Sequence, residues 1–393
     1  MESTGLSDAT AAEKLLDLLG ANALDQLDQP IETALSLPNP AYTSGAFFQL
    51  ENDRLFARTW MLAGYGHQVP EPGDVHPVSV AGQPLVLVHG HDGEVRVFHN
   101  VCQHRGTRVV REPCSNRKTL VCPYHAWTYD LDGTLIARPH FDGADRHARG
   151  WQGDEARDLK PVRSGRWLDL IFVNISGDAA PLDDYLKPMV GRMEGYDLTC
   201  LRYAGAVTFD LKANWKLAYE NYIETYHVFA VHPGLIKFAP MNTRKPTEHD
   251  GLCFYNEYQF PELEAGRGAG LPHYPGLPGA WHRRGLWFHM FPSFGVELFP
   301  DQFAVFHVIP VAPGLSREEI HIYLVGDAAD GPEHEAARNN VFETWRSLNE
   351  EDIWIVEELQ EGRRSSGFDG GRFSPHWEGA NHHFSKLVVD GIR

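Results

Sequence analysis

Hydrophobic positions change their spacing along the chain, and the change predicts two kinds of structure. From about residue 42 to residue 184, short apolar runs are separated by Gly and Pro. Runs of this kind are typical of β-strands, and the clearest cover residues 85–88, 95–98 and 170–173. We therefore expect a small all-β domain in this region.

The flanking regions have a different pattern. Residues 8–29 are leucine-rich among alanines and acids, which indicates helix, and a proline-punctuated connector follows. After about residue 186 the pattern is mixed, so the fold class is expected to be α+β. Helices are expected over about 215–231 and 333–361, strands over 285–290, 303–310 and 319–325, and a Gly- and Pro-rich loop over 264–279 that could border a site entrance. The predicted organisation is a helical segment over 1–41, the β domain over 42–185 and a mixed domain over 186–393.

Length and composition limit the class of protein. A chain of 393 residues exceeds one ordinary core, and 42% hydrophobic with 22% charged residues describes a globular protein. The formal net charge of −18 argues against binding to nucleic acid or to an anionic membrane surface, because both would repel it. The same charge could attract a cationic substrate or a positively charged redox partner. No apolar run approaches the length of a membrane span.

Two short loops each combine one cysteine with one histidine. They are Cys102-Gln103-His104 and Cys122-Pro123-Tyr124-His125. A structural zinc finger usually pairs Cys with Cys and His with His. A Rieske [2Fe–2S] cluster instead needs two Cys on one iron and two His on the other, so two mixed loops fit it well. The main alternative is a zinc site, and the other three cysteines are too few and too scattered for a disulfide framework, which predicts the reducing cytoplasm.

A second metal site is predicted around two more histidines. His227 and His232 are five residues apart, about 140° on an ideal helix, so both can bind one metal only if the helix loosens or ends between them. Pro233 makes such an ending plausible. Two imidazoles and one carboxylate form the facial triad of non-haem Fe(II) oxygenases. Ordinary core or surface histidines are the alternative.

The third ligand is expected to be a carboxylate that faces the protein core. Helical spacing over residues 349–360 places Asp352 on a stripe with Ile355, Val356 and Leu359. A buried carboxylate is unfavourable unless it is paired or binds a metal. Glu350 and Glu351 lie on other faces and are expected to be solvated, although Glu351 borders the stripe.

The whole chain resembles the catalytic α-subunit of the Rieske non-haem iron oxygenases, also called the aromatic-ring-hydroxylating oxygenases. The resemblance runs from about Tyr42 to the C-terminal helix and rests on the two loops with their flanks, on Asn214-Trp215-Lys216, on Glu220-Asn221, on the His227–His232 stretch and on Glu351-Asp352. It departs from the family at Ala126, where the family usually has Gly.

The resemblance implies a Rieske domain followed by a catalytic domain of the helix-grip type, an antiparallel sheet wrapped around a long helix as in START and Bet v1 proteins. It implies that Cys102, His104, Cys122 and His125 bind the [2Fe–2S] cluster and that His227, His232 and Asp352 bind mononuclear Fe(II). The 1–41 segment would pack on the catalytic domain. A separate NAD(P)H-dependent reductase, with or without a ferredoxin, would supply electrons. The subunits would form a homotrimer in which the cluster of one subunit serves the iron of its neighbour.

Glu224 falls on the carboxylate that links a cluster histidine to an iron-binding histidine in this family. It lies three residues before His227, on the same helix face. Glu at this position is similar to members that act on quaternary amines, although it is not confined to them. A solvated helix carboxylate is the alternative.

These residues predict an enzyme that uses O₂ to oxidise a small molecule. Glu224 and the acidic balance favour monooxygenation or N-demethylation of a quaternary or N-methylated amine. Hydroxylation or cis-dihydroxylation of an aromatic acid is the alternative, and the aromatic segment 287–299 suits either substrate or an ordinary strand core. A pure Rieske electron carrier would not need the second domain, and a zinc-stabilised binding protein would lack iron.

Overall fold

The computed structural model describes residues 8–151, 153, 156–292 and 294–393. Residues 1–7, which begin the expected N-terminal segment, and Ser293, within the aromatic segment, lie outside it. Contacts divide the chain into two units, residues 56–182 and residues 1–55 together with 183–393. Residues 42–55 thus belong with the larger unit, which differs from the boundary expected at residue 42. The cause is visible at Tyr42, whose fully buried ring places its hydroxyl 2.6 Å from Glu220 Oε1.

The smaller unit is built from three antiparallel sheets. Their strand orders are β1-β10-β9, β2-β3-β4 and β5-β6-β7-β8. The strands are β1 (Met61–Tyr65), β2 (Val75–Val80), β3 (Gln83–His89), β4 (Val95–His99), β5 (Leu120–Val121), β6 (Thr128–Tyr129), β7 (Leu135–Arg138), β8 (Ala148–Arg149), β9 (Arg163–Trp167) and β10 (Leu170–Asn174). The three strands expected from the apolar runs correspond to β3, β4 and β10, so the all-β prediction is confirmed.

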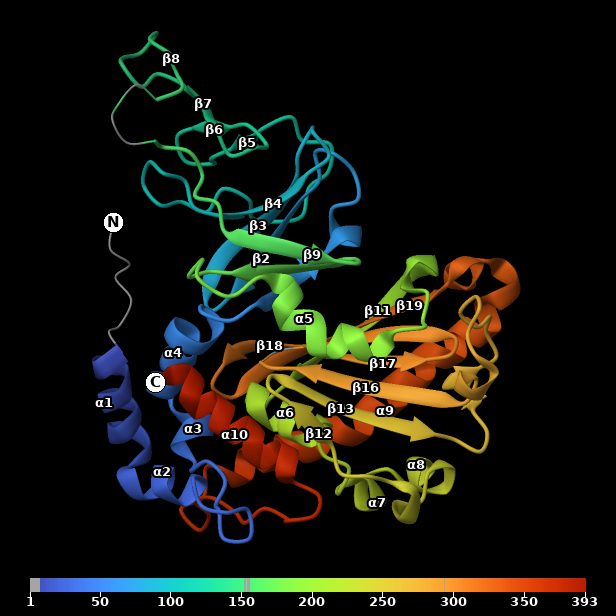
Figure 1. The fold of residues 1–393 in the computed structure, drawn as a ribbon. Coiled ribbons are helices and arrows are strands. Elements are labelled where there is room, and N and C mark those ends of the chain that lie inside the picture. The colour runs from blue at the N-terminus through green and yellow to red at the C-terminus, as the bar shows by residue number, and fades with distance from the viewer. Residues whose placement is uncertain (1–7, 152, 154–155, 293) are drawn as a thin grey trace. The chain divides into compact units, whose positions relative to one another are not determined.

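A seven-stranded antiparallel sheet forms the centre of the larger unit (Figure 1). Its strand order is β11-β19-β18-β17-β16-β13-β12. The strands are β11 (Leu201–Leu211), β12 (Glu248–Asp250), β13 (Cys253–Gln259), β16 (Arg284–Met290), β17 (Phe294–Phe299), β18 (Gln302–Ala312) and β19 (Leu315–Val325). The short β14 (Glu264–Ala265) and β15 (Gly268–Ala269) pair with each other outside this sheet.

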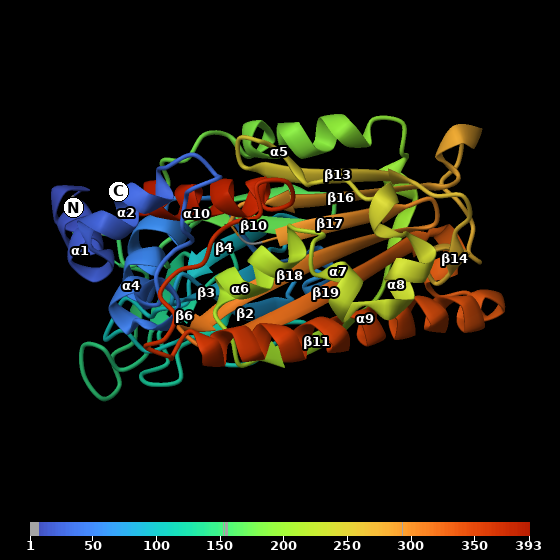
Figure 2. The same ribbon diagram turned by 90° about the horizontal axis from the view of Figure 1, so that it is seen from below.

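A long helix, α9 (Glu335–Gly362), runs along one face of this sheet (Figure 2). The sheet and the helix together confirm the expected helix-grip architecture. The other helices of the larger unit are α1 (Asp8–Leu19), α2 (Ala21–Leu27), α3 (Pro40–Thr43), α4 (Gly45–Leu50), α5 (Leu182–Val190), α6 (Trp215–Tyr222), α7 (Val228–Val231), α8 (Pro233–Phe238) and α10 (Gly379–Ile392). None of the described helices is long and apolar enough to cross a membrane.

Local sequence signals explain where several helices start and stop. The segment expected to be helical over 8–29 breaks at Gly20, whose φ of +79° suits glycine. The side chain of Asn214 caps α6 by accepting a hydrogen bond from Lys216 N at 3.0 Å. Lys216 in turn forms a fully buried ion pair with Glu51, at 2.5 Å, which ties the N-terminal part of the chain to α6.

Candidate metal centres and substrate pocket

The two Cys–His loops of the smaller unit place their two histidines side by side and bury their two cysteines. Cys102 and Cys122 are buried, whereas His104 and His125 are exposed. The centroids of the two imidazole rings lie 4.6 Å apart. The loops thus offer a sulfur pair on the inside and a nitrogen pair on the outside. That separation fits a Rieske cluster, whose two irons take different ligands.

Protein contacts fix the shape of the first loop. The buried amide of Asn100 accepts hydrogen bonds from the backbone N–H groups of Val109 and Val110, at 3.1 and 2.8 Å. The hydroxyl of Tyr129 lies 3.2 Å from Cys102 Sγ and accepts a hydrogen bond from Gln103 N at 3.0 Å. The indole of Trp127 stacks on the imidazole of His104, with centroids 4.7 Å apart and planes at 5°. The loop is therefore positioned by groups that do not bind metal.

Ala126, the one departure from the family pattern, has an unusual backbone conformation. Its φ is +56°, in the left-handed region, and its N–H donates to Cys122 O at 3.0 Å. Only glycine adopts this region without a steric penalty from Cβ. Having alanine instead of the family's usual glycine therefore strains the backbone as well as adding a methyl group.

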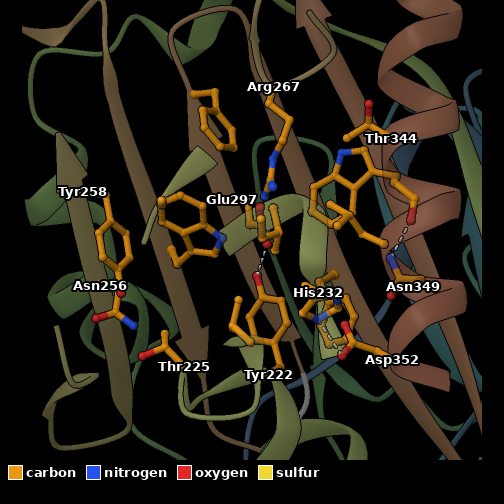
Figure 3. Close-up of a pocket in the computed structure, with 18 of the residues that line it drawn as sticks. Tyr222, Thr225, His232, Asn256, Tyr258, Arg267, Glu297, Thr344, Asn349 and Asp352 are labelled. Atoms are coloured by element: carbon orange, nitrogen blue, oxygen red, sulfur yellow. Dashed lines mark hydrogen bonds and ion pairs between the residues drawn. The ribbon is translucent and has the colours of Figure 1, made fainter. Parts of the chain in front are cut away.

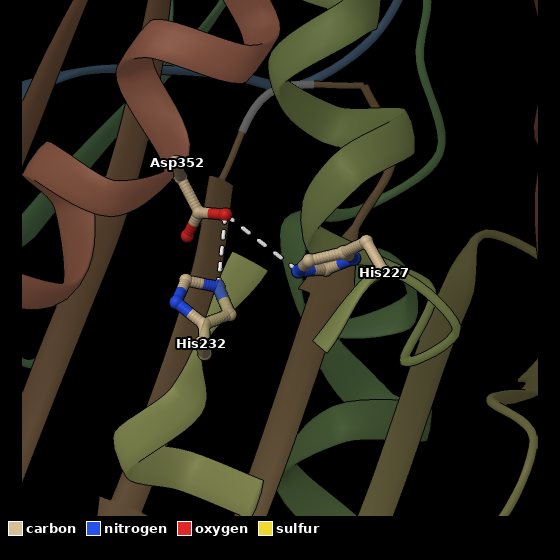
Figure 4. Close-up of side chains that lie close together, drawn as sticks. All are labelled: His227, His232 and Asp352. Carbon is tan, nitrogen blue, oxygen red and sulfur yellow. Dashed lines mark hydrogen bonds and ion pairs between the residues drawn. The ribbon is translucent and has the colours of Figure 1, made fainter. Parts of the chain in front are cut away.

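In the larger unit His227, His232 and Asp352 converge on one point (Figure 4). One ligand atom from each lies within 4.8 Å of the other two. Asp352 Oδ1 is 3.0 Å from His232 Nε2 and 3.6 Å from His227 Nε2. Two imidazole nitrogens and one carboxylate on one side of a point are the donor set of a facial triad. The three residues could hold a metal ion.

The chain leaves the helical conformation on both sides of these histidines. A single helix over about 215–231 was expected, and this was wrong, because α6 ends at Tyr222 and α7 begins only at Val228. The expected ending before Pro233 is confirmed, since His232 has φ −116° and ψ 77° and α8 begins with the proline. These interruptions allow both Nε2 atoms to face Asp352.

A carboxylate other than that of Asp352 lies beside the Nδ1 atom of each of these two imidazoles. His227 Nδ1 lies 2.5 Å from Glu224 Oε1, and His232 Nδ1 lies 2.7 Å from Glu351 Oε2. A carboxylate at Nδ1 keeps the proton there and leaves Nε2 free to bind a metal. Burial alone would lower the pKa of His232, but the hydrogen bonds and charges of Asp352 and Glu351 raise it above its ordinary value.

Glu351 is a functional candidate that the sequence analysis missed. The helix-face argument correctly separated it from Asp352, but assigned it to solvent. Its side chain is 35% exposed and still reaches His232. The sequence held two signals for Glu351, its position at the border of the buried stripe and its place in the Glu351-Asp352 pair that carries the family resemblance. Asp352 itself is also held by Asn221, whose Nδ2 donates to Oδ1 at 2.8 Å.

A cavity of about 140 Å³ adjoins the three converging side chains (Figure 3). This is close to the size of an engineered cavity that binds benzene. Its lining is rich in aromatic side chains, which are Tyr222, Tyr258, Phe260, Trp287, Phe299, Phe306 and Trp345. Only Trp287 and Phe299 of these come from the aromatic segment 287–299. That segment therefore contributes both to the pocket and to the core, where Phe288 and Leu298 are buried.

Three further charged groups of the cavity wall were not predicted as site residues. They are Arg244, Arg267 and Glu297. The hydroxyl of Tyr222 donates to Glu297 Oε1 at 3.0 Å, and Arg267 points toward the same carboxylate (Figure 3). Burial raises the pKa of Glu297 to about 7, although Arg267 and the hydrogen bonds from Tyr222 and Trp287 lower it.

Comparison with known proteins agrees with the two predicted domains and with the cofactors that they imply. Residues 59–148 match the family model of the Rieske [2Fe-2S] domain, and residues 198–393 match that of the ring hydroxylating alpha subunit (catalytic domain). The glycine betaine monooxygenase oxygenase subunit of Pseudomonas aeruginosa is 27% identical over 378 residues, which cover 88% of this chain and 86% of the relative. The carnitine monooxygenase oxygenase subunit of Escherichia coli K12 is 26% identical over 345 residues, covering 86% and 87%.

Solved structures share the fold. The quaternary ammonium Rieske monooxygenase CntA in complex with L-carnitine has a TM-score of 0.75 at 23% identity, covering 92% of this chain and 96% of that one. Naphthalene 1,2-dioxygenase from Rhodococcus sp. has a TM-score of 0.71 at 17% identity, covering 97% and 98%.

The fold and the two sites define a Rieske oxygenase. The chain belongs to the Rieske non-haem iron oxygenases, as an α-subunit. Its cofactors are a Rieske [2Fe–2S] cluster and a mononuclear non-haem iron, and it is an oxidoreductase that uses O₂. Membership of the family also implies a small-molecule substrate and a separate reductase.

Proposed function

We propose that the chain is the oxygenase component of a monooxygenase that acts on a small quaternary or N-methylated amine. The aromatic cavity of about 140 Å³ beside the three converging side chains carries this proposal. Aromatic faces attract a quaternary ammonium through cation–π interactions. The names of the full-length relatives, which are glycine betaine and carnitine monooxygenases, support the same class of substrate.

The metal ligands are part of the proposal. Cys102 and Cys122 would hold one iron of the cluster, and His104 and His125 the other. His227, His232 and Asp352 would hold the mononuclear iron. When bound, the cluster supplies single electrons and the mononuclear iron supplies O₂ activation. The protein contributes by holding Nε2 of each histidine toward Asp352 and by placing the substrate in the adjoining cavity.

Glu224 is proposed to connect the two centres between subunits. Its carboxylate is already bound to His227 Nδ1 at 2.5 Å, and it also accepts the backbone N–H of His227 at 3.1 Å. A homotrimer, in which a cluster histidine of a neighbouring subunit reaches the same carboxylate, would complete the link. An NAD(P)H-dependent reductase, with or without a ferredoxin, would reduce the cluster in the cytoplasm.

Product analysis tests the substrate class. O₂ uptake with a reductase should be measured for betaines, carnitine, choline and aromatic acids, with product identification and with peroxide assayed to exclude uncoupled uptake. An N-methyl or N-alkyl oxidation product is expected. A hydroxylated ring from an aromatic acid, with no amine turned over, would contradict the proposal and favour the ring-hydroxylating alternative.

Metal analysis and two variants test the site residues. The protein should contain two cluster irons and a third iron, and colourless protein with stoichiometric zinc would contradict this. His227→Ala should keep the brown cluster but lose the third iron and turnover. Glu224→Gln should retain both metals while cluster reduction no longer leads to product. Full activity of that variant would rule out the linking role.

A further inference from the structure

A buried arginine lies one aromatic ring away from a proposed ligand of the cluster. Arg138, the last residue of β7, is only 6% exposed. Its guanidinium carbon lies 5.8 Å from the centre of the Trp127 ring. The same indole stacks on the imidazole of His104, with centroids 4.7 Å apart and planes at 5°. A single indole therefore links the cation to the first cluster loop.

The contacts of the Arg138 guanidinium leave its charge in place. Its carbon lies 4.2 Å from the centre of the Phe141 ring and 4.8 Å from that of Trp151, and its Nε donates to Gly150 O at 2.8 Å. Aromatic faces and a carbonyl oxygen replace part of the lost hydration of a buried cation. Among the residues that the structure describes, no carboxylate forms an ion pair with Arg138. The guanidinium is thus stabilised without being neutralised.

A charge that is not neutralised affects a nearby redox centre. Reduction of the cluster adds one negative charge, so a positive charge close by stabilises the reduced form, and local charge is one determinant of cluster potentials. Because Arg138 is buried, water and salt screen its charge less than that of Arg105, which is exposed in the first loop. At a separation of about 10 Å and an effective dielectric constant of about 20, one unit charge favours reduction roughly tenfold.

We propose that Arg138 raises the reduction potential of the Rieske cluster through its charge, across Trp127 and His104. Arg138 acts at a distance and is neither a metal ligand nor a catalytic residue. Its charge favours electron transfer from the reductase to this unit. The inference rests on the proposed binding of the cluster by His104, and it makes no assumption about the substrate.

The test measures the midpoint potential of the cluster by redox titration followed by electron paramagnetic resonance. The holoenzyme is compared with Arg138→Met, which keeps most of the bulk and removes the charge, and with Arg138→Lys, which keeps the charge. Arg163→Met is the matched control, because Arg163 also lies over an indole, 5.1 Å from the centre of the Trp60 ring, but belongs to β9 of another sheet. Iron content and cluster absorption show whether each variant is intact.

We expect Arg138→Met to shift the reduction equilibrium about tenfold toward the oxidised cluster, which is about 59 mV lower for one electron. Arg138→Lys should keep most of the wild-type potential, and Arg163→Met should keep all of it. A potential that is unchanged in Arg138→Met, or that falls equally in Arg138→Met and Arg138→Lys, would overturn the inference.

A second pair of variants tests the same charge if Arg138→Met does not retain its cluster. Phe141 contacts the guanidinium and is 45% exposed, so its ring can be replaced by a polar side chain at the surface. Phe141→Glu would place a carboxylate beside Arg138 and neutralise its charge, whereas Phe141→Gln would not. The potential should be lower in Phe141→Glu than in Phe141→Gln, and equal potentials would overturn the inference.

The spectrum of the wild-type cluster separates this inference from the assignment of the ligands. Absence of a Rieske spectrum would contradict the proposed ligands and, with them, this inference. A normal Rieske spectrum with a potential that does not depend on the charge at residue 138 would contradict only the role of Arg138.

Discussion

Replacing Glu351 by Gln removes the charge behind one proposed iron ligand and keeps an oxygen that can accept the same hydrogen bond. The carboxylate lies 2.7 Å from His232 Nδ1, a distance typical of a charge-assisted hydrogen bond. Loss of such a partner usually weakens metal binding 10- to 100-fold. Because the Glu351 side chain is 35% exposed and the amide can still accept, we expect the lower end, about tenfold or about 1.4 kcal/mol.

The size of the effect should depend on pH. Glu351 raises the pKa of His232, so it strengthens the binding of a competing proton as well as that of the metal. Removing the charge of Glu351 weakens the binding of the proton and the binding of the metal. Below the pKa of His232 the two losses partly cancel, whereas well above it only the loss of metal affinity remains. The loss should therefore grow as the pH rises through the raised pKa of His232, and be smaller below the ordinary histidine pKa of about 6.5.

Anaerobic Fe(II) titration against a competing chelator measures this affinity, and cluster absorption shows that the rest of the protein is intact. Glu350→Gln is the matched control, because Glu350 is the preceding residue on the same helix and is exposed. An unchanged affinity at pH 8, or an equal loss in Glu350→Gln, would refute the role given to Glu351.

Three further predictions concern other parts of the chain. Ala126→Gly should raise the free energy of unfolding by about 1 kcal/mol, because the left-handed φ of +56° strains alanine. Urea unfolding followed by cluster absorption measures this, and a midpoint that fell or stayed constant would contradict it. Tyr129→Phe should lower the reduction potential of the cluster, since the hydroxyl 3.2 Å from Cys102 Sγ stabilises the reduced state, and a redox titration followed by electron paramagnetic resonance measures it. Lys216→Met should lower the free energy of unfolding, measured in urea, by about 3–5 kcal/mol, because it leaves Glu51 charged and buried without its partner. The double variant with Glu51→Leu should recover most of that loss, and a double variant as unstable as the single one would show that the ion pair is not its cause.

Helix periodicity selected Asp352, which the structure places beside His227 and His232, but it described the surroundings of Asp352 only in part. Leu359, expected on the buried stripe, is 44% exposed, and Gln360 is buried in its place. The reason is non-local, since Gln360 Oε1 accepts a hydrogen bond from the backbone N–H of Asn214, the residue that caps α6. A hydrophobic pattern cannot reveal a polar residue that is buried in order to satisfy a distant backbone group. The hydrophobic pattern therefore predicts which face of the helix is buried better than it predicts the burial of each residue on that face.

The cluster loops and the substrate pocket differ in how far their determinants are spread along the chain. Each loop holds its Cys and its His within four residues, so spacing alone predicts the site. The cavity wall instead depends on strand register, which sets Trp287 of β16 opposite Glu297 of β17. A slip of one residue would turn Val296 or Leu298 toward the cavity, because successive side chains of a strand point to opposite faces. Neither Glu297 nor Arg267 carries a local signal of its role, and their function follows only from what the folded sheet and the β14–β15 turn place across from them.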